Sequence, residues 1–547
     1  MHLIGTWHKL SRGELRAPND LSFIKLHISD AVTLIEDNRR KLIYEGIIFG
    51  ATNQALLDDP RLLDRAFGYY TYILFEKDSG TVYLGADRLG FGPVYYAWQG
   101  NTFHFSSSLT LLKYALDIVT PNLDACDEII TVGDILGEKT IINEANRLRW
   151  GRKFRMSADR VDTVDTWDPE IPAFVDRKRY IHANNELIVE AMEQTKSCKR
   201  PKFVLLSGGD DSRRLAAAAC HVALPITCVT QEVVGKEASD KDVLLAEAVC
   251  RSLGVPHIRV SRPSHRDLHN DTIVQNYWTA YESGQHGWIL PLLRCIPRGA
   301  MIYDGIVADV TVNGHYFRAY PELVTRFDDV DYAAQLLCGC KQSGIDPKQI
   351  SAPLFERVRA ELALYPDSPH RLTYYFLLNH TRRCIGSSWF GLFYLFGHLP
   401  CPPYMYYPFL IQSLSLEPKH YLDAWMQNEC LREMNPAAAA IPSTRNKVPA
   451  EYVIDRTSEA QSWAKFEARQ IQMRRDVTRY FPGLKANQRM FEAMSLIGLG
   501  GYCNRWSWAP KTLAWFSEFL NWIEDRQAPE FPVMREANGF LRRHLLG

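Results

Sequence analysis

The residues with the clearest chemical potential form the run 207–212, Ser-Gly-Gly-Asp-Asp-Ser. The apolar residues 203–206 precede this run and an alanine-rich stretch follows it, which predicts a turn between a buried strand and a helix. Gly208 and Gly209 allow the backbone to approach a ligand closely, and the free N–H groups at the start of a helix favour an anion. Asp211 adds a carboxylate that suits a magnesium ion on bound phosphate. The run therefore predicts a phosphate site with a metal ligand built into it.

The elements that position this turn are expected to alternate between helix and strand from about residue 180. Helical patterns cover 182–193, 212–221 and 239–253, and short apolar runs cover 203–206, 226–230 and 257–260. Such alternation predicts a doubly wound parallel sheet, whose ligands bind at the carboxyl ends of the strands. Ser207 lies at such an end. After about residue 315 the chain is expected to be mainly helical.

The first part of the chain shows a different pattern. Short alternating runs occur at 69–74, 82–85 and 94–98, with turn residues between them, and they predict a β-rich domain. We place the boundary in the polar segment 163–172, so that the expected domains cover residues 1–165 and 175–547. The expected fold class is therefore α/β, with a β-rich part followed by a parallel-sheet part.

Composition narrows the class of protein. A chain of 547 residues is too long for one hydrophobic core and predicts two or more domains. Its 63 basic and 63 acidic residues offer no attraction to nucleic acid or to an anionic membrane. The stretch 384–415 lacks charge, but glycines and prolines interrupt it, so we expect a buried helix followed by a loop and no membrane span. Twelve scattered cysteines and no apolar leader predict reduced thiols and a cytoplasmic protein.

The pattern Ser-Gly-Gly-x-Asp-Ser resembles the pyrophosphate-binding loop of the ATP pyrophosphatase enzymes, which split ATP between its α- and β-phosphates. An ordinary turn capped by Ser212 is the alternative, and the six matching residues in a strand–turn–helix context disfavour it. Segments 302–310 and 442–449 resemble parts of asparagine synthetases. Asp309 falls where that family places a second magnesium ligand, and Lys447 where it places an active-site lysine. A helix-capping aspartate and a solvated surface lysine are the open alternatives.

The N-terminal segments 67–75, 84–96 and 105–108 resemble the glutaminase domain of the same family. This family is the asparagine synthetase-like amide ligases, which include β-lactam synthetases and lasso-peptide cyclases. The resemblance implies an N-terminal αββα sandwich of the Ntn type. A doubly wound ATP-pyrophosphatase domain with a helical C-terminal region would follow it.

Two departures from the family pattern bear on function. The family's glutaminase uses the thiolate of an N-terminal cysteine as its nucleophile. This chain begins Met-His-Leu, and its first cysteine is Cys126, so we expect the domain not to hydrolyse glutamine. β-Lactam synthetases also keep the domain without that cysteine. Ile306 stands where asparagine synthetases have a glutamate, with Asp304 as a nearby substitute, and this weakens aspartate as the expected substrate.

The resemblance implies an ATP-dependent ligase that joins a carboxylate to an amine through an acyl-adenylate and releases AMP and pyrophosphate. ATP and Mg²⁺ are the implied cofactors. The implied partners are a small-molecule or peptide carboxylate and an amine, and a homodimer is an open option. The expected site places phosphates at Ser207, Gly208, Gly209 and Ser212, adenine at Leu205 and Thr230, and the metal at Asp211 and Asp309. Lys447 would stabilise transition-state charge, an effect worth roughly 3–4 kcal/mol by analogy with oxyanion holes.

Two other functions stay open at this point. One is an intramolecular, peptide or amino-sugar amide ligase of the lasso-cyclase or β-lactam-synthetase type. The other is a non-catalytic relative that keeps its ATP affinity, against which the retained Asp211 and Asp309 argue. Arg213 and Arg214 open the expected helix, where one of them would reach a phosphate or form a salt bridge on the sheet surface.

Overall fold

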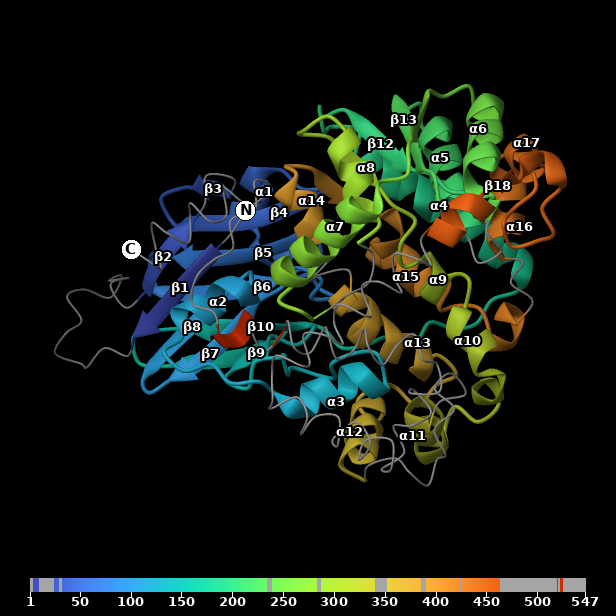
Figure 1. Ribbon diagram of the computed structural model, residues 1–547. Helices are drawn as coiled ribbons and strands as arrows, with labels where there is room; N and C mark the ends of the chain where they lie inside the picture. The colour runs from blue at the N-terminus through green and yellow to red at the C-terminus, as the bar shows by residue number, and fades with distance from the viewer. Residues whose placement is uncertain are drawn as a thin grey trace.

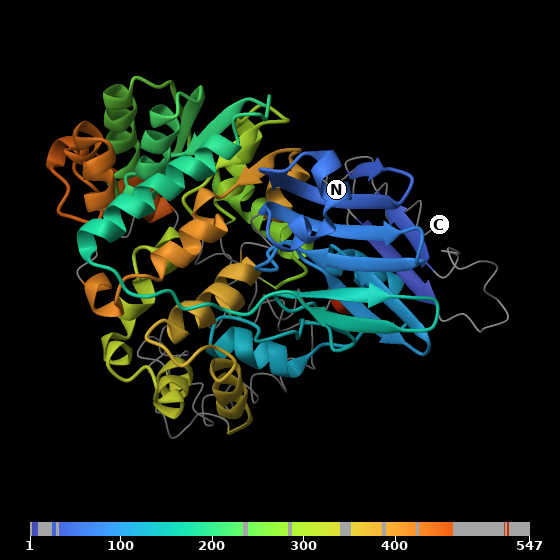
Figure 2. The ribbon, with the colours of Figure 1, turned by 180° about the vertical axis from the view of Figure 1, so that it is seen from behind.

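The computed structural model describes residues 3–8, 24–28, 32–233, 239–282, 287–339, 352–384, 390–422, 426–462, 519 and 522–524. Two antiparallel sheets lie face to face on one side of the molecule, and a parallel sheet with its helices lies on the other (Figure 1). Figure 2 shows the same arrangement from behind, with the extended connection 166–176 running from the sandwich to the first long helix.

The sandwich consists of a five-stranded and a six-stranded sheet in which all neighbouring strands are antiparallel. The first sheet has the order β2 (Ile24–Ile28), β1 (Leu3–His8), β8 (Thr102–Ser106), β7 (Tyr95–Gln99) and β9 (Ala145–Arg147). The second has the order β11 (Val161–Asp165), β10 (Arg152–Met156), β6 (Thr81–Ala86), β5 (Phe67–Glu76), β4 (Arg40–Phe49) and β3 (Thr33–Glu36). The expected runs 69–74, 82–85 and 94–98 correspond to β5, β6 and β7.

Both faces of β5 are covered, which explains why its sequence is apolar almost throughout. Ile73 and Phe75 point into the core between the sheets, where they meet Trp7 and Phe103. On the opposite face, Tyr70, Tyr72 and Leu74 pack against α1 (Asn53–Asp58) and η1 (Pro60–Asp64). Helix α2 (Leu109–Ala115) packs on the outer face of the other sheet. The layer order therefore agrees with a helix–sheet–sheet–helix sandwich, with helices of only one or two turns.

The parallel sheet has the strand order β15 (His257–Val260), β13 (Ile226–Gln231), β12 (Lys202–Leu205), β16 (Met301–Tyr303) and β17 (Leu399–Cys401). Helices α5 (Asp210–His221) and α6 (Asp242–Leu253) cover one face, and α8 (Ile289–Cys295) covers the other (Figure 1). From β12 the chain first proceeds outward through β13 to β15 and then returns to β16 on the other side. The topological switch point therefore lies between β12 and β16, where ligands of such sheets bind.

The chain after residue 315 is mainly helical, as expected. Its described helices include α10 (His315–Ala319), α11 (Val330–Gly339), α12 (Ala352–Leu362), α13 (Arg371–Tyr375), the π-helical η4 (Phe376–Thr381), α14 (Phe390–Leu395), α15 (Tyr407–Ser413), α16 (Met426–Met434) and α17 (Pro436–Ala439). Among the described residues, no helix combines the length and apolar character needed to cross a bilayer.

The uncharged stretch 384–415 corrects one expectation. In place of a buried helix followed by a loop, it contains α14, the strand β17, a 3₁₀ turn at Pro403–Met405 and α15. Among the described strands, β17 pairs with β16 alone and so forms an edge of the sheet, which is why Pro400 is tolerated in it. Three apolar residues between turns are too short a signal to distinguish a strand from a loop.

The sandwich and the parallel-sheet part share one hydrophobic core. Phe67 and Trp150 of the sandwich belong to the same buried cluster as Val204 of β12 and Phe393 of α14. Residues 166–176 contain neither helix nor strand, and α4 (Arg177–Gln194) follows them. The division into 1–165 and 175–547 stays a prediction, and most of 463–547 lies outside the described residues.

Candidate functional site

The turn 207–212 follows β12 at the switch point and remains open to solvent at Ser207 and Gly209. Helix α5 begins at Asp210, two residues earlier than expected, with Gly209 as its N-cap. Ser212 lies inside this helix, and its Oγ accepts a hydrogen bond from the Ser207 N–H at 3.0 Å. Because Ser212 is not the cap, the alternative of an ordinary serine-capped turn does not describe this segment.

Gly208 has no room for a side chain. A Cβ there would lie 2.6 Å from Cγ2 of Thr444, 3.0 Å from Cδ1 of Leu245 and 3.1 Å from Oδ1 of Asp242. The backbone is held on both sides, since the Gly208 N–H donates to Asp242 Oδ1 at 2.6 Å and the Thr444 N–H donates to the Gly208 carbonyl at 3.0 Å. The loop that carries Lys447 is therefore attached directly to the turn.

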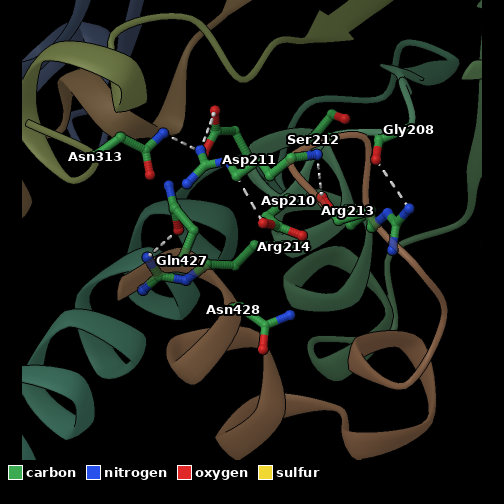
Figure 3. A network of polar contacts seen from close by, with 12 residues as sticks. Gly208, Asp210, Asp211, Ser212, Arg213, Arg214, Asn313, Gln427 and Asn428 are labelled. Atoms are coloured by element: carbon green, nitrogen blue, oxygen red, sulfur yellow. Dashed lines mark hydrogen bonds and ion pairs between the residues drawn. The ribbon is translucent and has the colours of Figure 1, made fainter. Parts of the chain in front are cut away.

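Arg213 and Arg214 correct a second expectation, because both are fully buried. Arg213 Nη2 donates to the Gly208 carbonyl at 2.9 Å (Figure 3). Its Nη1 donates to the carbonyl of Ile441 at 2.8 Å. Arg214 donates to Gln427 Oε1 at 3.0 Å and packs over Phe409. These arginines therefore hold the turn, its helix and the following loop together, and neither forms a salt bridge on the sheet surface.

The second acidic segment lies directly against the turn. It follows β16, and a Cβ on Gly305 would lie 3.2 Å from the Ser212 nitrogen and 3.3 Å from Cβ of Asp211. Val307, fully buried, has φ of 82° at the start of α9 (Ala308–Thr311). A β-branched residue at positive φ is strained, and such strain concentrates at functional sites. The strained residue places Asp309 in an exposed position two residues later.

Asp211 is the electrostatic centre of the site. Its Oδ1 accepts a hydrogen bond from Asn313 Nδ2 at 2.8 Å (Figure 3). Its backbone carbonyl accepts one from Tyr404 Oη at 2.8 Å. Burial raises the pKa of Asp211 to about 6, and the negative charge of Asp309 adds to this effect, while Arg445 and the Asn313 bond oppose it. Asp309 therefore lies close enough to Asp211 for its negative charge to act on that carboxyl.

The donor set around Asp211 fits a hard cation. Asp211 and Asp309 supply carboxylate oxygens, and the buried Oδ1 of Asp210 has no hydrogen-bond partner among the residues that the structure describes. A concentration of negative charge with oxygen donors and solvent access suits Mg²⁺, which keeps several of its own waters.

The structure brings most of the expected residues together. Ser207, Gly208, Gly209, Asp211 and Ser212 lie in one turn, in which Gly208 and Ser212 are buried, and Asp309 lies near Asp211. Within the described part of the chain, the exposed Lys447 forms no hydrogen bond or ion pair with this turn.

The two residues expected at adenine are buried. Leu205 lies in the sheet core, and Thr230 Oγ1 donates to the Leu206 carbonyl at 2.7 Å and lies 3.0 Å from His257 Nε2. Their contact with adenine stays a prediction.

Two site residues escaped sequence reasoning, Asn313 and Arg445. Asn313 lies four residues after Asp309, in the run Val-Thr-Val-Asn. Its amide is the one feature of this run that could have indicated a site residue. Arg445 lies two residues before Lys447, in the same segment that carries the family resemblance. Its Nη2 lies 3.3 Å from Asp211 Oδ1.

The loop after Arg445 is attached to the sheet at its far end as well. Strand β18 (Ile454–Asp455) pairs antiparallel with β14 (Ser239–Asp240). Arg456 extends this attachment, because its Nη2 lies 3.3 Å from Glu232 Oε2 and 3.6 Å from Asp240 Oδ2. The segment between Thr444 and β18 is therefore fixed at both ends.

A small cavity of about 40 Å³ lies where the sandwich meets α7 (His265–Trp278). Burial raises the pKa of Glu45, which lines the cavity and accepts a hydrogen bond from Ser107. The Leu3 N–H donates to Ser107 Oγ at 3.1 Å, so the start of β1 lies at the edge of this cavity. Residues 1 and 2, on which the expected loss of glutaminase chemistry depends, lie outside the described residues.

Comparison with known proteins supports the assignment of the N-terminal part. Residues 57–167 match the glutamine amidotransferase domain family. A putative glutamine-hydrolyzing asparagine synthetase 2 of Methanocaldococcus jannaschii is 28% identical over 151 residues, which cover 26% of this chain and 29% of that protein. The chain thus matches about three tenths of the length of this curated relative.

Two solved structures share weaker likeness. One is the glutamine phosphoribosylpyrophosphate amidotransferase from B. subtilis complexed with ADP and GMP, and the other is described as an allosteric regulatory enzyme of purine biosynthesis. Each is 10% identical with a TM-score of 0.18; the first match covers 59% of this chain and 78% of the other, the second 48% and 76%. At this TM-score the likeness carries no structural argument. The two sequence matches support an asparagine synthetase-like glutamine amidotransferase domain within this chain.

Proposed function

We propose that this protein is an ATP-dependent amide ligase that activates a carboxylate as its adenylate and transfers the acyl group to an amine. The observation that carries the proposal is the convergence of Asp211 and Asp309 beside the open turn at the switch point. The asparagine synthetase-like match over 151 residues supports the amide-forming class. The division into an amidotransferase-like domain and a ligase domain belongs to the same proposal.

The turn supplies the contacts that a triphosphate requires. Ser207 Oγ and the Gly209 N–H, now joined to each other at 3.2 Å, would exchange that bond for contacts with phosphate oxygens. Asp211 and Asp309 would hold Mg²⁺, whose charge offsets the negative charge that builds on departing pyrophosphate. The Arg445 guanidinium, which contacts Asp211, would transfer to the phosphates.

The reaction divides into two displacements. A substrate carboxylate oxygen attacks the α-phosphorus, and the bond to the bridging oxygen of pyrophosphate breaks. The amine then attacks the acyl carbon, AMP leaves with its oxygen, and the amine proton passes to solvent. Lys447, exposed on the loop beside the turn, would stabilise the charge that develops in both steps.

The nitrogen source is the second part of the proposal. We infer that the amine comes from solution or from the substrate itself, without glutamine hydrolysis by this chain. An intramolecular or peptide ligase and a non-catalytic ATP-binding protein are the competing functions, and the same assay separates all three.

The test is pyrophosphate release from ATP across a panel of carboxylates, each with ammonia, glutamine or an amino-sugar as acceptor. We expect release with a subset of carboxylates, AMP in equal amount, and loss of turnover in Asp211→Asn. Asp267→Asn, at an exposed helix start, is the matched control and should keep full activity. No pyrophosphate with any carboxylate, or full turnover in Asp211→Asn, would contradict the proposal. Stimulation by glutamine in a purified sample would contradict only the nitrogen-source part.

A further inference from the structure

We propose that Asp134, His380 and Cys384 form a zinc site that joins the sandwich to the helical region. Asp134 follows α3 (Leu123–Thr131) in the sandwich part of the chain, and His380 lies in the π-helical segment η4. Cys384 comes four residues after His380, so that one helical segment offers two of the three ligands. This proposal stands independently of the amide ligase function.

The donor atoms converge. One ligand atom from each of the three side chains lies within 4.8 Å of the other two. His380 Nδ1 lies 2.6 Å from Asp134 Oδ1 and 3.9 Å from Cys384 Sγ. Imidazole, thiolate and carboxylate are the ligands that Zn²⁺ takes, and three protein ligands leave a fourth position for water. Asp134 and Cys384 are buried, whereas the His380 side chain is 23% exposed, which gives that position access to solvent.

The pattern of contacts favours a cation over a simple hydrogen-bonded pair. Asp134 and Cys384 both face the same nitrogen of His380, and one proton on that nitrogen serves one acceptor well, whereas a metal ion bonds to all three atoms. With bond lengths of about 2.0–2.3 Å, a tetrahedral ion separates its donors by about 3.3–3.6 Å, so Asp134 Oδ1 would retreat by less than about 1 Å. The ion displaces the Nδ1 and thiol protons to solvent, and no electron is transferred.

The segments that carry the ligands are already fixed to each other. The Gly137 N–H donates to Asn379 Oδ1 at 3.1 Å, and Arg383 Nη2 donates to the carbonyls of Gly137 and Lys139 at 2.7 and 2.6 Å. These hydrogen bonds join the same two parts of the chain that carry the trio. The π-helical turn adds a second indication, because such turns recur at functional sites in otherwise regular helices.

The test is zinc content of the full-length chain, with any affinity tag removed, after exposure to Zn²⁺ and exhaustive dialysis. We expect about one zinc per chain, and a fall to background in His380→Gln and in Cys384→Ser. Cys430→Ser removes a buried thiol on α16, outside the trio, and should keep the metal. Background zinc in the unaltered chain, or zinc retained in both His380→Gln and Cys384→Ser, would overturn the proposal.

A measurement on the unaltered chain covers the case in which the variants fail to fold. Cobalt(II) in place of zinc should give a thiolate-to-cobalt charge-transfer band and the visible bands of a four-coordinate ion. A cobalt spectrum without the charge-transfer band would exclude the thiolate ligand and overturn the site. A chelator should also lower the unfolding midpoint of the zinc-loaded chain, and an unchanged midpoint would remove the joining role.

Discussion

The guanidinium of Arg445 lies against the carboxylate of Asp211, with Nη2 3.3 Å from Oδ1 and 3.5 Å from Oδ2. Its Nε also lies 3.5 Å from Oδ2 of the neighbouring Asp210. Arg445 thus offsets part of the negative charge of the two adjacent carboxylates. Under the proposed function, we expect the Arg445 guanidinium to leave Asp211 when Mg²⁺ and ATP bind.

Replacing Arg445 should weaken nucleotide binding more than it slows the chemical step. A hydrogen bond to a charged group contributes about 1.5–3 kcal/mol, which corresponds to roughly 10–150-fold in affinity. We therefore expect Arg445→Ala to raise the KM for ATP by at least about 10-fold, with Arg445→Lys intermediate. Steady-state pyrophosphate release at varied ATP measures this. An unchanged KM in Arg445→Ala would show that the residue stays on the aspartates throughout.

Gly208→Ala should abolish turnover through a clash that a second substitution relieves. The added Cβ would lie 2.6 Å from Cγ2 of Thr444, and Thr444→Ser removes that methyl group while keeping the hydroxyl. We expect the double variant to regain part of the activity, because the contacts at 3.0 and 3.1 Å with Leu245 and Asp242 remain tight. Thr444→Ser alone is the control and should be nearly normal. Equal loss in the single and double variants would place the fault elsewhere in the turn.

Glu282→Gln should destabilise the whole protein. Glu282 Oε1 lies 3.3 Å from Arg383 Nη1, Oε2 accepts a hydrogen bond from Tyr95 Oη at 2.8 Å, and the two charged side chains are 0% and 2% exposed. Removing one charge of a buried pair leaves the other uncompensated and costs about 3–5 kcal/mol. Asp331→Asn breaks the exposed pair with Arg359 and should cost under about 1 kcal/mol. Urea unfolding monitored by circular dichroism compares the two, and equal losses would refute the role of burial.

His370 should make stability fall with acid. Burial lowers its pKa to about 4, and its Nε2 lies 2.8 Å from the Leu416 carbonyl. Because the folded state binds this proton less tightly than the unfolded state, the contribution of neutral His370 is complete above pH 6.5. It decreases by up to about 1.4 kcal/mol per unit as the pH falls toward 4. We expect a shallower pH dependence of the unfolding free energy in His370→Gln, and no change of slope in the exposed control His182→Gln.

The central part of the fold could be predicted because its signals are local. The strands 226–230 and 257–260 and the helices 182–193 and 212–221 appear within a few residues of their expected positions, since apolar runs and helical spacing decide them. Strand β17 was missed because three residues at a sheet edge gain their structure from β16, about 100 residues earlier in the chain. No local sequence pattern indicates which distant strand a short segment will pair with.

The same distinction between local signals and distant contacts applies to the residues of the site. The turn could be named from its residue types and spacing, and Asp309 from the family resemblance, but Asn313 and Arg445 acquire their roles only where three loops meet. Arg213 shows the opposite case. An arginine beside a predicted phosphate-binding turn suggests a phosphate contact, but its guanidinium donates to the carbonyls of Gly208 and Ile441. Whether a charge faces a ligand or the protein depends on tertiary contacts that sequence spacing does not encode.

The double attachment of the segment between Thr444 and β18 limits how an active site here can protect its intermediate. This segment is hydrogen-bonded to the turn at Thr444 and paired with β14 at its other end, so it cannot open as a hinged lid. Under the proposed function, nucleotide would enter and pyrophosphate would leave through rotation of side chains such as Arg445. In such a site, water would compete with the amine for the proposed acyl-adenylate. The yield of amide per ATP should therefore increase with the concentration of acceptor.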